Sequence, residues 1–203
     1  MYDQLATDQT IEKTVQALKS NGIETIVVAN GEEAKKKVLE MLPQNAEVMT
    51  MSSVTLDTVG ITDEINKSGK YNSARNKLYS MDRVKDGAAM NKLGAAPGWT
   101  VGSVHVVTED GKLLIASNTG SQLPAYAYAS DNVIWVIGAQ KIVRDTNEGI
   151  KRINEYVLPL ESERAKKAYG VPGSNVSKLL IINKEVNPQR KLTAIIVKEK
   201  LGF

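Results

Sequence analysis

Two short polar loops in this 203-residue chain carry residue types that bind anions. Ser52, Ser53 and Thr55 follow an apolar stretch, and the second loop consists of Asn118, Thr119, Gly120 and Ser121. Each loop leads into a predicted helix, where hydroxyls and backbone N–H groups can bind a carboxylate or a phosphate. The structural alternatives are helix capping by Ser53 or Thr55 and a tight turn capped by Thr119 or Ser121. We take anion binding by the two loops together as the working hypothesis.

Lys141 supplies a positive charge at a third position. It follows Gly138-Ala139-Gln140 at the end of an apolar strand predicted for residues 132–137. A lysine there can neutralise a bound carboxylate or, if it is shielded from water, form a Schiff base with a carbonyl compound. A solvated surface lysine is the structural alternative. Lys141 is therefore a predicted ligand-binding residue and a weak catalytic candidate.

Side chains suited to acid–base catalysis are few. Glu109 is the other weak catalytic candidate, but with Asp110 it lies in a Glu-Asp-Gly-Lys sequence typical of a solvated hairpin turn. His105 is the single histidine, and no carboxylate that would orient it can be identified from the sequence. We interpret His105 as a structural residue, and the catalytic residues stay unknown.

The absence of cysteine excludes several chemistries. The chain can form no disulfide, no thiolate nucleophile and no Cys-ligated zinc or iron–sulfur site, and one histidine cannot build a multi-histidine metal site. It also has no Walker loop and no G-x-G-x-x-G fingerprint. We expect no metal and find no evident cofactor, so any redox centre would belong to a partner.

Strands and helices alternate along the chain. This pattern favours an α/β fold with a mainly parallel sheet flanked by helices on both faces. A helix that begins near residue 145 is expected to end at Pro159, and the last two strands, 178–183 and 192–198, are expected to form a C-terminal antiparallel pair. The other predicted elements are an N-terminal helix at about 8–21, a helix at 32–42, strands at 25–29 and 47–51, and two strands joined by the Glu109–Lys112 turn.

A chain of this length fits a single domain, which we expect to span residues 1–203 with the N-terminal helix packed on it. In parallel sheets, the loops that follow the carboxyl ends of the strands converge at one edge. The loops at 52–55, 118–121 and 138–141 are therefore expected to meet at one site.

Composition limits the classes of partner. The 26 basic and 23 acidic residues are interspersed, so the net charge of +3 is not gathered into the basic face of a nucleic-acid-binding protein. No run approaches the ~18 apolar residues needed to span a bilayer, and the N-terminal sequence lacks a signal peptide pattern. We expect a cytoplasmic protein that binds neither nucleic acid nor membrane.

The order of these motifs resembles the lactate-utilisation (LUD) domain family. The similar stretches are GSVHVVTEDGKLLIASNTGSQLPA, VIWVIGAQKIVRDTNEGIKRI and PLESERAKKAYG, and the Ser52–Leu56 stretch ahead of Gly60 resembles an early Ser/Thr-Leu motif of the family. The resemblance covers roughly residues 8–203. It implies a fold like that of sugar-phosphate isomerases and coenzyme A transferases, and a part in bacterial oxidation of lactate to pyruvate beside iron–sulfur and oxidoreductase subunits.

Two departures from related proteins bear on activity. Several family members carry a cysteine-rich segment late in the chain, where this sequence reads Val171–Lys178, and Gly102-Ser103-Val104 stands where some related isomerases have a catalytic aspartate. We therefore expect a protein that binds a small anionic organic acid or a phosphorylated metabolite and contributes to lactate oxidation without its own redox centre. The alternatives are a non-catalytic assembly subunit for iron–sulfur or oxidoreductase partners, and an enzyme like the coenzyme A transferases or sugar-phosphate isomerases. Assembly into a homo-oligomer stays open.

Overall fold

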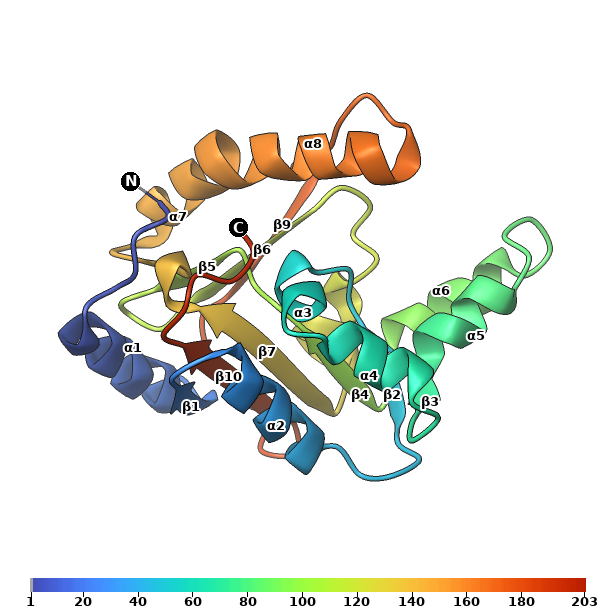
Figure 1. The fold of residues 1–203 in the computed structure, drawn as a ribbon, viewed down its shortest axis with the longest axis horizontal. Helices are drawn as coiled ribbons and strands as arrows, with labels where there is room; N and C mark the ends of the chain where they lie inside the picture. The colour runs from blue at the N-terminus through green and yellow to red at the C-terminus, as the bar shows by residue number, and fades with distance from the viewer. Residues whose placement is uncertain (1) are drawn as a thin grey trace.

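The computed structural model describes residues 2–203 as two sheets enclosed by helices (Figure 1). The larger sheet has six parallel strands in the order β1-β10-β7-β4-β2-β3. Its α/β architecture confirms the predicted fold class. The strands are β1 (Glu24–Val28), β2 (Glu47–Thr50), β3 (Asn72–Ser73), β4 (Trp99–Gly102), β7 (Asn132–Gly138) and β10 (Lys191–Val197).

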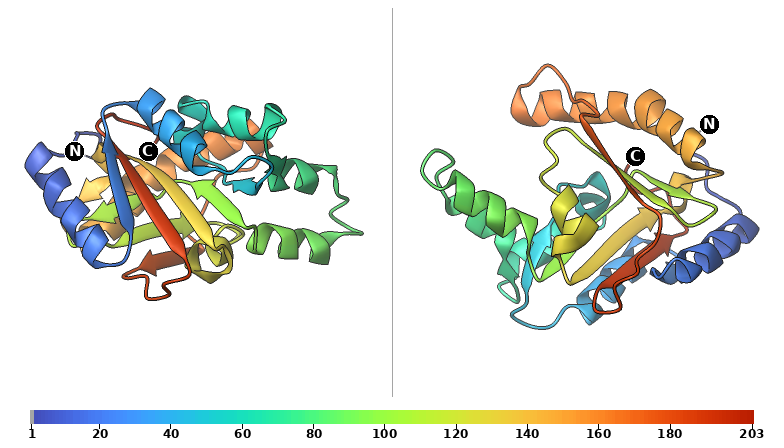
Figure 2. Two further views of the ribbon diagram at one scale, coloured as in Figure 1. Left: turned by 90° about the horizontal axis from the view of Figure 1, so that it is seen from below. Right: turned by 180° about the vertical axis from the view of Figure 1, so that it is seen from behind.

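Central strands β7 and β10 are almost entirely apolar because both of their faces are covered. One face packs on α2 (Gly31–Met41), α3 (Val54–Thr58) and α4 (Ile61–Lys67), with Val38, Leu56 and Ile65 in the shared core. The other face packs on α1 (Asp8–Ser20), the π-helical turn η1 (Ala125–Ala129) and the second sheet. The sheet therefore has helices on one face and a mixed layer on the other (Figure 2).

The smaller sheet has the order β8-β5-β6-β9 and contains the predicted hairpin. Its strands are β5 (Val106–Thr108), β6 (Leu113–Ser117), β8 (Ile142–Val143) and β9 (Lys178–Ile182). β5 and β6 pair antiparallel across the Glu109–Lys112 turn, as expected. Near the C-terminus, β9 forms an antiparallel pair, but its partner is β6. The last strand, β10, lies between β1 and β7 and is parallel to both. The last two strands therefore belong to different sheets and do not pair with each other.

A continuous helical segment covers the outer face of the smaller sheet. It consists of α7 (Thr146–Arg152), the π-helical turn η3 (Ile153–Val157) and α8 (Leu158–Tyr169). Asp145 caps its start by accepting a hydrogen bond from the backbone N–H of Glu148. Pro159 was expected to end the helix, but the helical segment continues through it, and the π-helical turn η3 directly before it already interrupts the regular α-helical hydrogen bonds. α8 therefore runs on past the edge of the sheet (Figure 1).

Two short helices form an arm that projects from the body of the molecule (Figure 1). They are α5 (Ala74–Ser80) and α6 (Gly87–Ala95), and α6 has no buried residue. Among residues 2–203, no helix has the length and apolar character that would let it cross a membrane.

Candidate functional site

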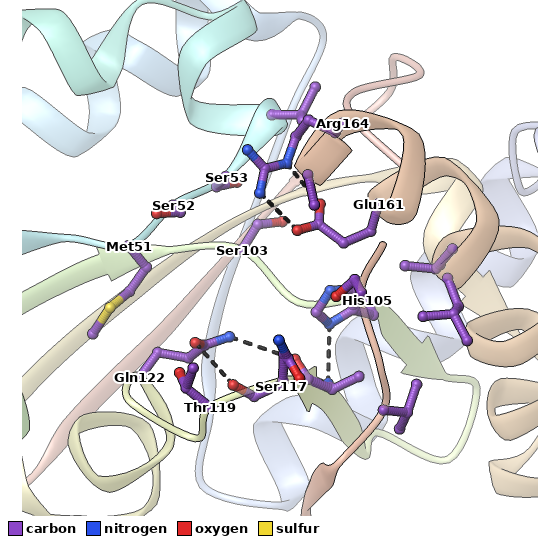
Figure 3. Close-up of a pocket in the computed structure, with 18 of the residues that line it drawn as sticks. Met51, Ser52, Ser53, Ser103, His105, Ser117, Thr119, Gln122, Glu161 and Arg164 are labelled. Carbon is purple, nitrogen blue, oxygen red and sulfur yellow. Dashed lines mark hydrogen bonds and ion pairs between the residues drawn. The ribbon is translucent and has the colours of Figure 1, made fainter. Parts of the chain in front are cut away.

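A cavity of about 570 Å³ opens where β2, β6 and β7 end. All three predicted loops contribute to its wall. The loops after β2 and β7 meet there because these strands are parallel in one sheet, whereas the 118–121 loop reaches the cavity from β6 of the smaller sheet. Figure 3 shows Ser52 and Ser53 on one side of it and Ser117 and Thr119 on another, with Arg164 of α8 opposite Ser117 and Thr119. The predicted ligand-binding residues in the wall are Ser52, Ser53, Thr55, Asn118, Thr119, Ser121 and Lys141, and of the predicted ligand-binding residues Gly120 alone is not part of it.

Lys141 is buried in the wall of this cavity, with 2% of its surface exposed. It ends the short 3₁₀ turn η2 (Ala139–Lys141) that follows β7. Its Nζ donates to Thr55 Oγ1 at 3.0 Å, Ser103 Oγ at 3.2 Å and the carbonyl oxygen of Val104 at 3.2 Å. Burial, reinforced by the charge of Arg152, lowers the pKa of Lys141 to about 7. The structure therefore excludes the solvated surface lysine that the sequence allowed.

The loop at 52–55 combines capping with side chains that face the cavity. Ser53 Oγ accepts from the N–H of Leu56 at 3.4 Å and caps α3, as the structural alternative predicted. Thr55 is buried, accepts from Lys141 and donates to the carbonyl oxygen of Leu201 at 3.2 Å. The exposed Ser52 accepts from Arg75 at 3.3 Å. Ser52 is thus the most accessible of the three hydroxyls.

In the loop at 118–121, two backbone N–H groups donate to neighbouring side chains and are not available to a ligand. The N–H of Gly120 donates to Ser117 Oγ at 2.8 Å, and the N–H of Ser121 donates to Thr119 Oγ1 at 3.3 Å. These two amides therefore do not point outward, which differs from the arrangement expected from the sequence. Gly120 itself adopts a positive φ of 87°, so its role is to shape the turn. The groups that this loop offers to a ligand are the side chains of Asn118, Thr119 and Ser121.

His105 also lies in the cavity wall, a position that the sequence did not suggest. Its Nδ1 accepts a hydrogen bond from the N–H of Ala116 at 3.1 Å, so the ring proton must be on Nε2 (Figure 3). Burial and the nearby charges of Lys141 and Arg152 lower the pKa of His105 to about 3. His105 is therefore a neutral hydrogen-bond donor at physiological pH.

Arg152 holds the backbone of His105 in position from outside the cavity. It is fully buried, donates to the carbonyl oxygen of His105 at 2.7 Å and stacks on the Tyr156 ring at 5.1 Å. Its Nε has no hydrogen-bond partner among the described residues. Burial lowers the pKa of Arg152 to about 10, so the side chain is still a cation at neutral pH.

α8 contributes an ion pair that sequence analysis missed. Arg164 binds Glu161 through two hydrogen bonds, at 2.7 Å and 2.6 Å, and stacks on Tyr169 at 5.3 Å. The paired carboxylate raises the pKa of Arg164. The i, i+3 spacing signals such a pair, but nothing local shows that α8 crosses the cavity.

Charge in the cavity wall is predominantly positive. Arg83, Lys141 and Arg164 carry positive charge, and Glu161 is the one acidic residue in the wall. Glu109, the other weak catalytic candidate, is not in the wall; its carboxylate pairs with Lys13 of α1 at 2.7 Å. The cavity thus has more cationic than anionic groups, together with hydroxyl and imidazole hydrogen-bond donors. This combination is suited to binding an anion.

Comparison with known proteins agrees with this architecture. A crystal structure of a DUF162 family protein from Deinococcus radiodurans aligns with a TM-score of 0.60, covering 96% of this chain and 99% of that one at 12% sequence identity. That likeness concerns the fold. No curated protein matches the sequence. The sequence profile of the LUD domain matches residues 11–197, nearly the whole chain, and the protein therefore belongs to the LUD domain family.

Proposed function

We propose that the protein binds a small organic acid, of the class of lactate and pyruvate, in the cavity between the three loops. Membership of the LUD family supports a role related to lactate utilisation. The main support for the proposal is Lys141. Its buried ammonium group has hydroxyl and carbonyl partners but no ion-pair partner among residues 2–203. Such a charge is costly to bury without an opposite charge, and a bound carboxylate would supply the missing negative charge.

The surroundings of Lys141 favour a small ligand with further polar groups. Ser52, Thr119 and His105 offer hydroxyl and N–H donors from different sides of the same cavity. A 2-hydroxy or 2-oxo acid has a second oxygen next to its carboxylate and can use such a donor. Oxidation itself needs an electron acceptor, which we assign to a partner because the chain has no cysteine for a cluster of its own.

Thermal unfolding in the presence of candidate ligands tests the proposal. Lactate or pyruvate at concentrations well above Kd should raise the melting temperature, because a ligand that binds the folded state alone stabilises it. Sugar phosphates and acyl-coenzyme A are the comparison ligands for the phosphorylated class. The gain should vanish in Lys141→Met and persist in Lys36→Met, which removes an exposed lysine on α2. Stabilisation of equal size in Lys141→Met would contradict the assignment.

A second candidate role, as an assembly subunit, is favoured by the arm formed by α5 and α6. Tyr79 and Val84 on the arm are 73% and 94% exposed, and α6 has no buried residue, so the arm carries apolar side chains that the body of the molecule does not cover. If the arm docks an oxidoreductase partner, Val84→Glu should abolish co-purification with that partner while ligand-induced stabilisation is unchanged. If Val84→Glu leaves co-purification intact, the arm is not the docking surface.

A further inference from the structure

Lys141 combines three properties that seldom occur together in a lysine. It is 2% exposed, it lies in the wall of a cavity large enough for a metabolite, and no acidic side chain among residues 2–203 pairs with it. Arg152, a second buried cation, further disfavours the ammonium form. With a pKa near 7, a substantial fraction of Lys141 is the neutral amine at physiological pH, and the neutral amine is the nucleophilic form.

The neighbours of Nζ are suited to a reaction at a carbonyl group. Ser103 Oγ lies 3.2 Å from Nζ and can exchange a proton with it. Val104, whose carbonyl oxygen also accepts from Nζ, directly precedes His105 in the chain, so the imidazole and the amine share one wall. Since Nδ1 of His105 is occupied by the N–H of Ala116, its Nε2–H is left to donate to an oxygen in the cavity.

We propose that Lys141 is a Schiff-base lysine, whose Nζ forms an imine with the 2-carbonyl carbon of a 2-oxo acid bound in the cavity. The inference rests on the proposed organic-acid site and narrows its ligand class to one that includes a ketone. The lone pair of Nζ attacks the carbonyl carbon, and the carbonyl oxygen becomes the hydroxyl of a carbinolamine. Both amine hydrogens then leave with that oxygen as water, so the exchange needs no oxidant, reductant or further reactant.

The imine also keeps the electrostatic role of Lys141. A proton from solvent converts the imine into an iminium ion, which has the same charge as the original ammonium and lies beside the ligand carboxylate. His105 can stabilise the oxygen of the carbinolamine through its Nε2–H, while Arg152 holds the His105 backbone in place. The same residue thus serves as counter-charge for lactate and as nucleophile for pyruvate.

Reductive trapping with sodium borohydride tests the inference on the full chain. With pyruvate present, intact-mass analysis should show one adduct per chain, and peptide mapping should place it on Lys141. Lactate has no carbonyl group, so it should give no adduct by itself and should suppress trapping by pyruvate through competition. Lys141→Arg, which keeps the charge, should lose the adduct, whereas Lys36→Met should keep it.

The outcomes separate this inference from the organic-acid site itself. If pyruvate and lactate both raise the melting temperature but no adduct forms, or if adducts spread over exposed lysines, the Schiff base is refuted and the binding site stands. If neither acid changes the melting temperature and Lys141 is not modified, both proposals fail. Because the mapping is done on the wild-type chain, the result does not depend on how well Lys141→Arg folds.

Discussion

Replacing Lys141 with methionine should change how the stability of the protein depends on pH. The folded-state pKa of Lys141 is about 7, against an ordinary value of 10.5. Below pH 7 the lysine is charged in both the folded and the unfolded state, so the full cost of burying the ammonium is present. Between pH 7 and 10.5 the unfolded chain binds more protons than the folded one, so stability rises with pH. Each pKa unit corresponds to about 1.4 kcal/mol, which makes the full cost about 5 kcal/mol.

Urea unfolding of the wild type and of Lys141→Met at pH 6 and pH 9 measures this effect. The wild type should gain about 2–3 kcal/mol of unfolding free energy relative to the variant between the two pH values. The three hydrogen bonds of Nζ are lost in the variant at both pH values. Their loss therefore changes the difference in unfolding free energy at any one pH more than it changes how that difference varies with pH. Lys36→Met on the exposed face of α2 is the matched control and should follow the wild type. Parallel stability curves for wild type and Lys141→Met would refute the argument that burial lowers the pKa of Lys141.

Three further predictions follow from other buried contacts. The single histidine, His105, should show ring NMR signals that stay constant between pH 5 and 8 and report the Nε2–H tautomer, because its pKa is about 3. Arg190→Met should lower the unfolding free energy by about 3–5 kcal/mol, since the guanidinium binds Glu185 and the carbonyl oxygens of η1 and Ser130 from a buried position. Gly102→Ala should cost about 1–3 kcal/mol because its Cβ would lie 1.8 Å from the Tyr126 hydroxyl, and adding Tyr126→Phe should recover part of that loss.

A different result in each measurement would contradict the corresponding prediction. A His105 signal that titrates near pH 6.5 would mean that the ring is solvated. Arg190→Met should be compared with Arg144→Met, which removes an exposed ion pair worth little, and equal losses would show that burial of Arg190 is not what matters. If Tyr126→Phe leaves the cost of Gly102→Ala unchanged, the hydroxyl is not the clashing group.

Elements with local signals could be predicted from the sequence. Thr7 and Asn21 cap α1 where the sequence places the ends of a helix, and the Glu109–Lys112 turn closes the expected hairpin. The information for such features lies within a few residues of chain. The separate sheets of β9 and β10 could not be predicted in this way, because pairing of β10 with β1 joins residues at opposite ends of the sequence.

Some residues of the candidate site could also be predicted from the sequence, and others could not. Convergence of the loops follows from the rule that parallel strands end at one edge, so Ser53, Thr55 and Lys141 could be placed together from the sequence. His105, Glu161 and Arg164 were missed because the smaller sheet and α8 supply them, and neither has a local signal for where it packs. The burial of Lys141 was not predictable either, since its ammonium group is held by Thr55, Ser103 and Val104, which are distant from it in the sequence.

The cost of burying Lys141 is itself an argument for a functional role. A methionine or leucine of similar volume would fill the same space without the desolvation penalty, and the charge of Arg152, a second buried cation, adds to that penalty. A fold gains nothing in stability from two buried positive charges of which one disfavours the charged form of the other. What the arrangement does provide is a preorganised positive field and a reactive amine, facing a cavity whose other groups donate hydrogen bonds. Under the proposed function, the bound ligand would restore the stability that is lost at this position.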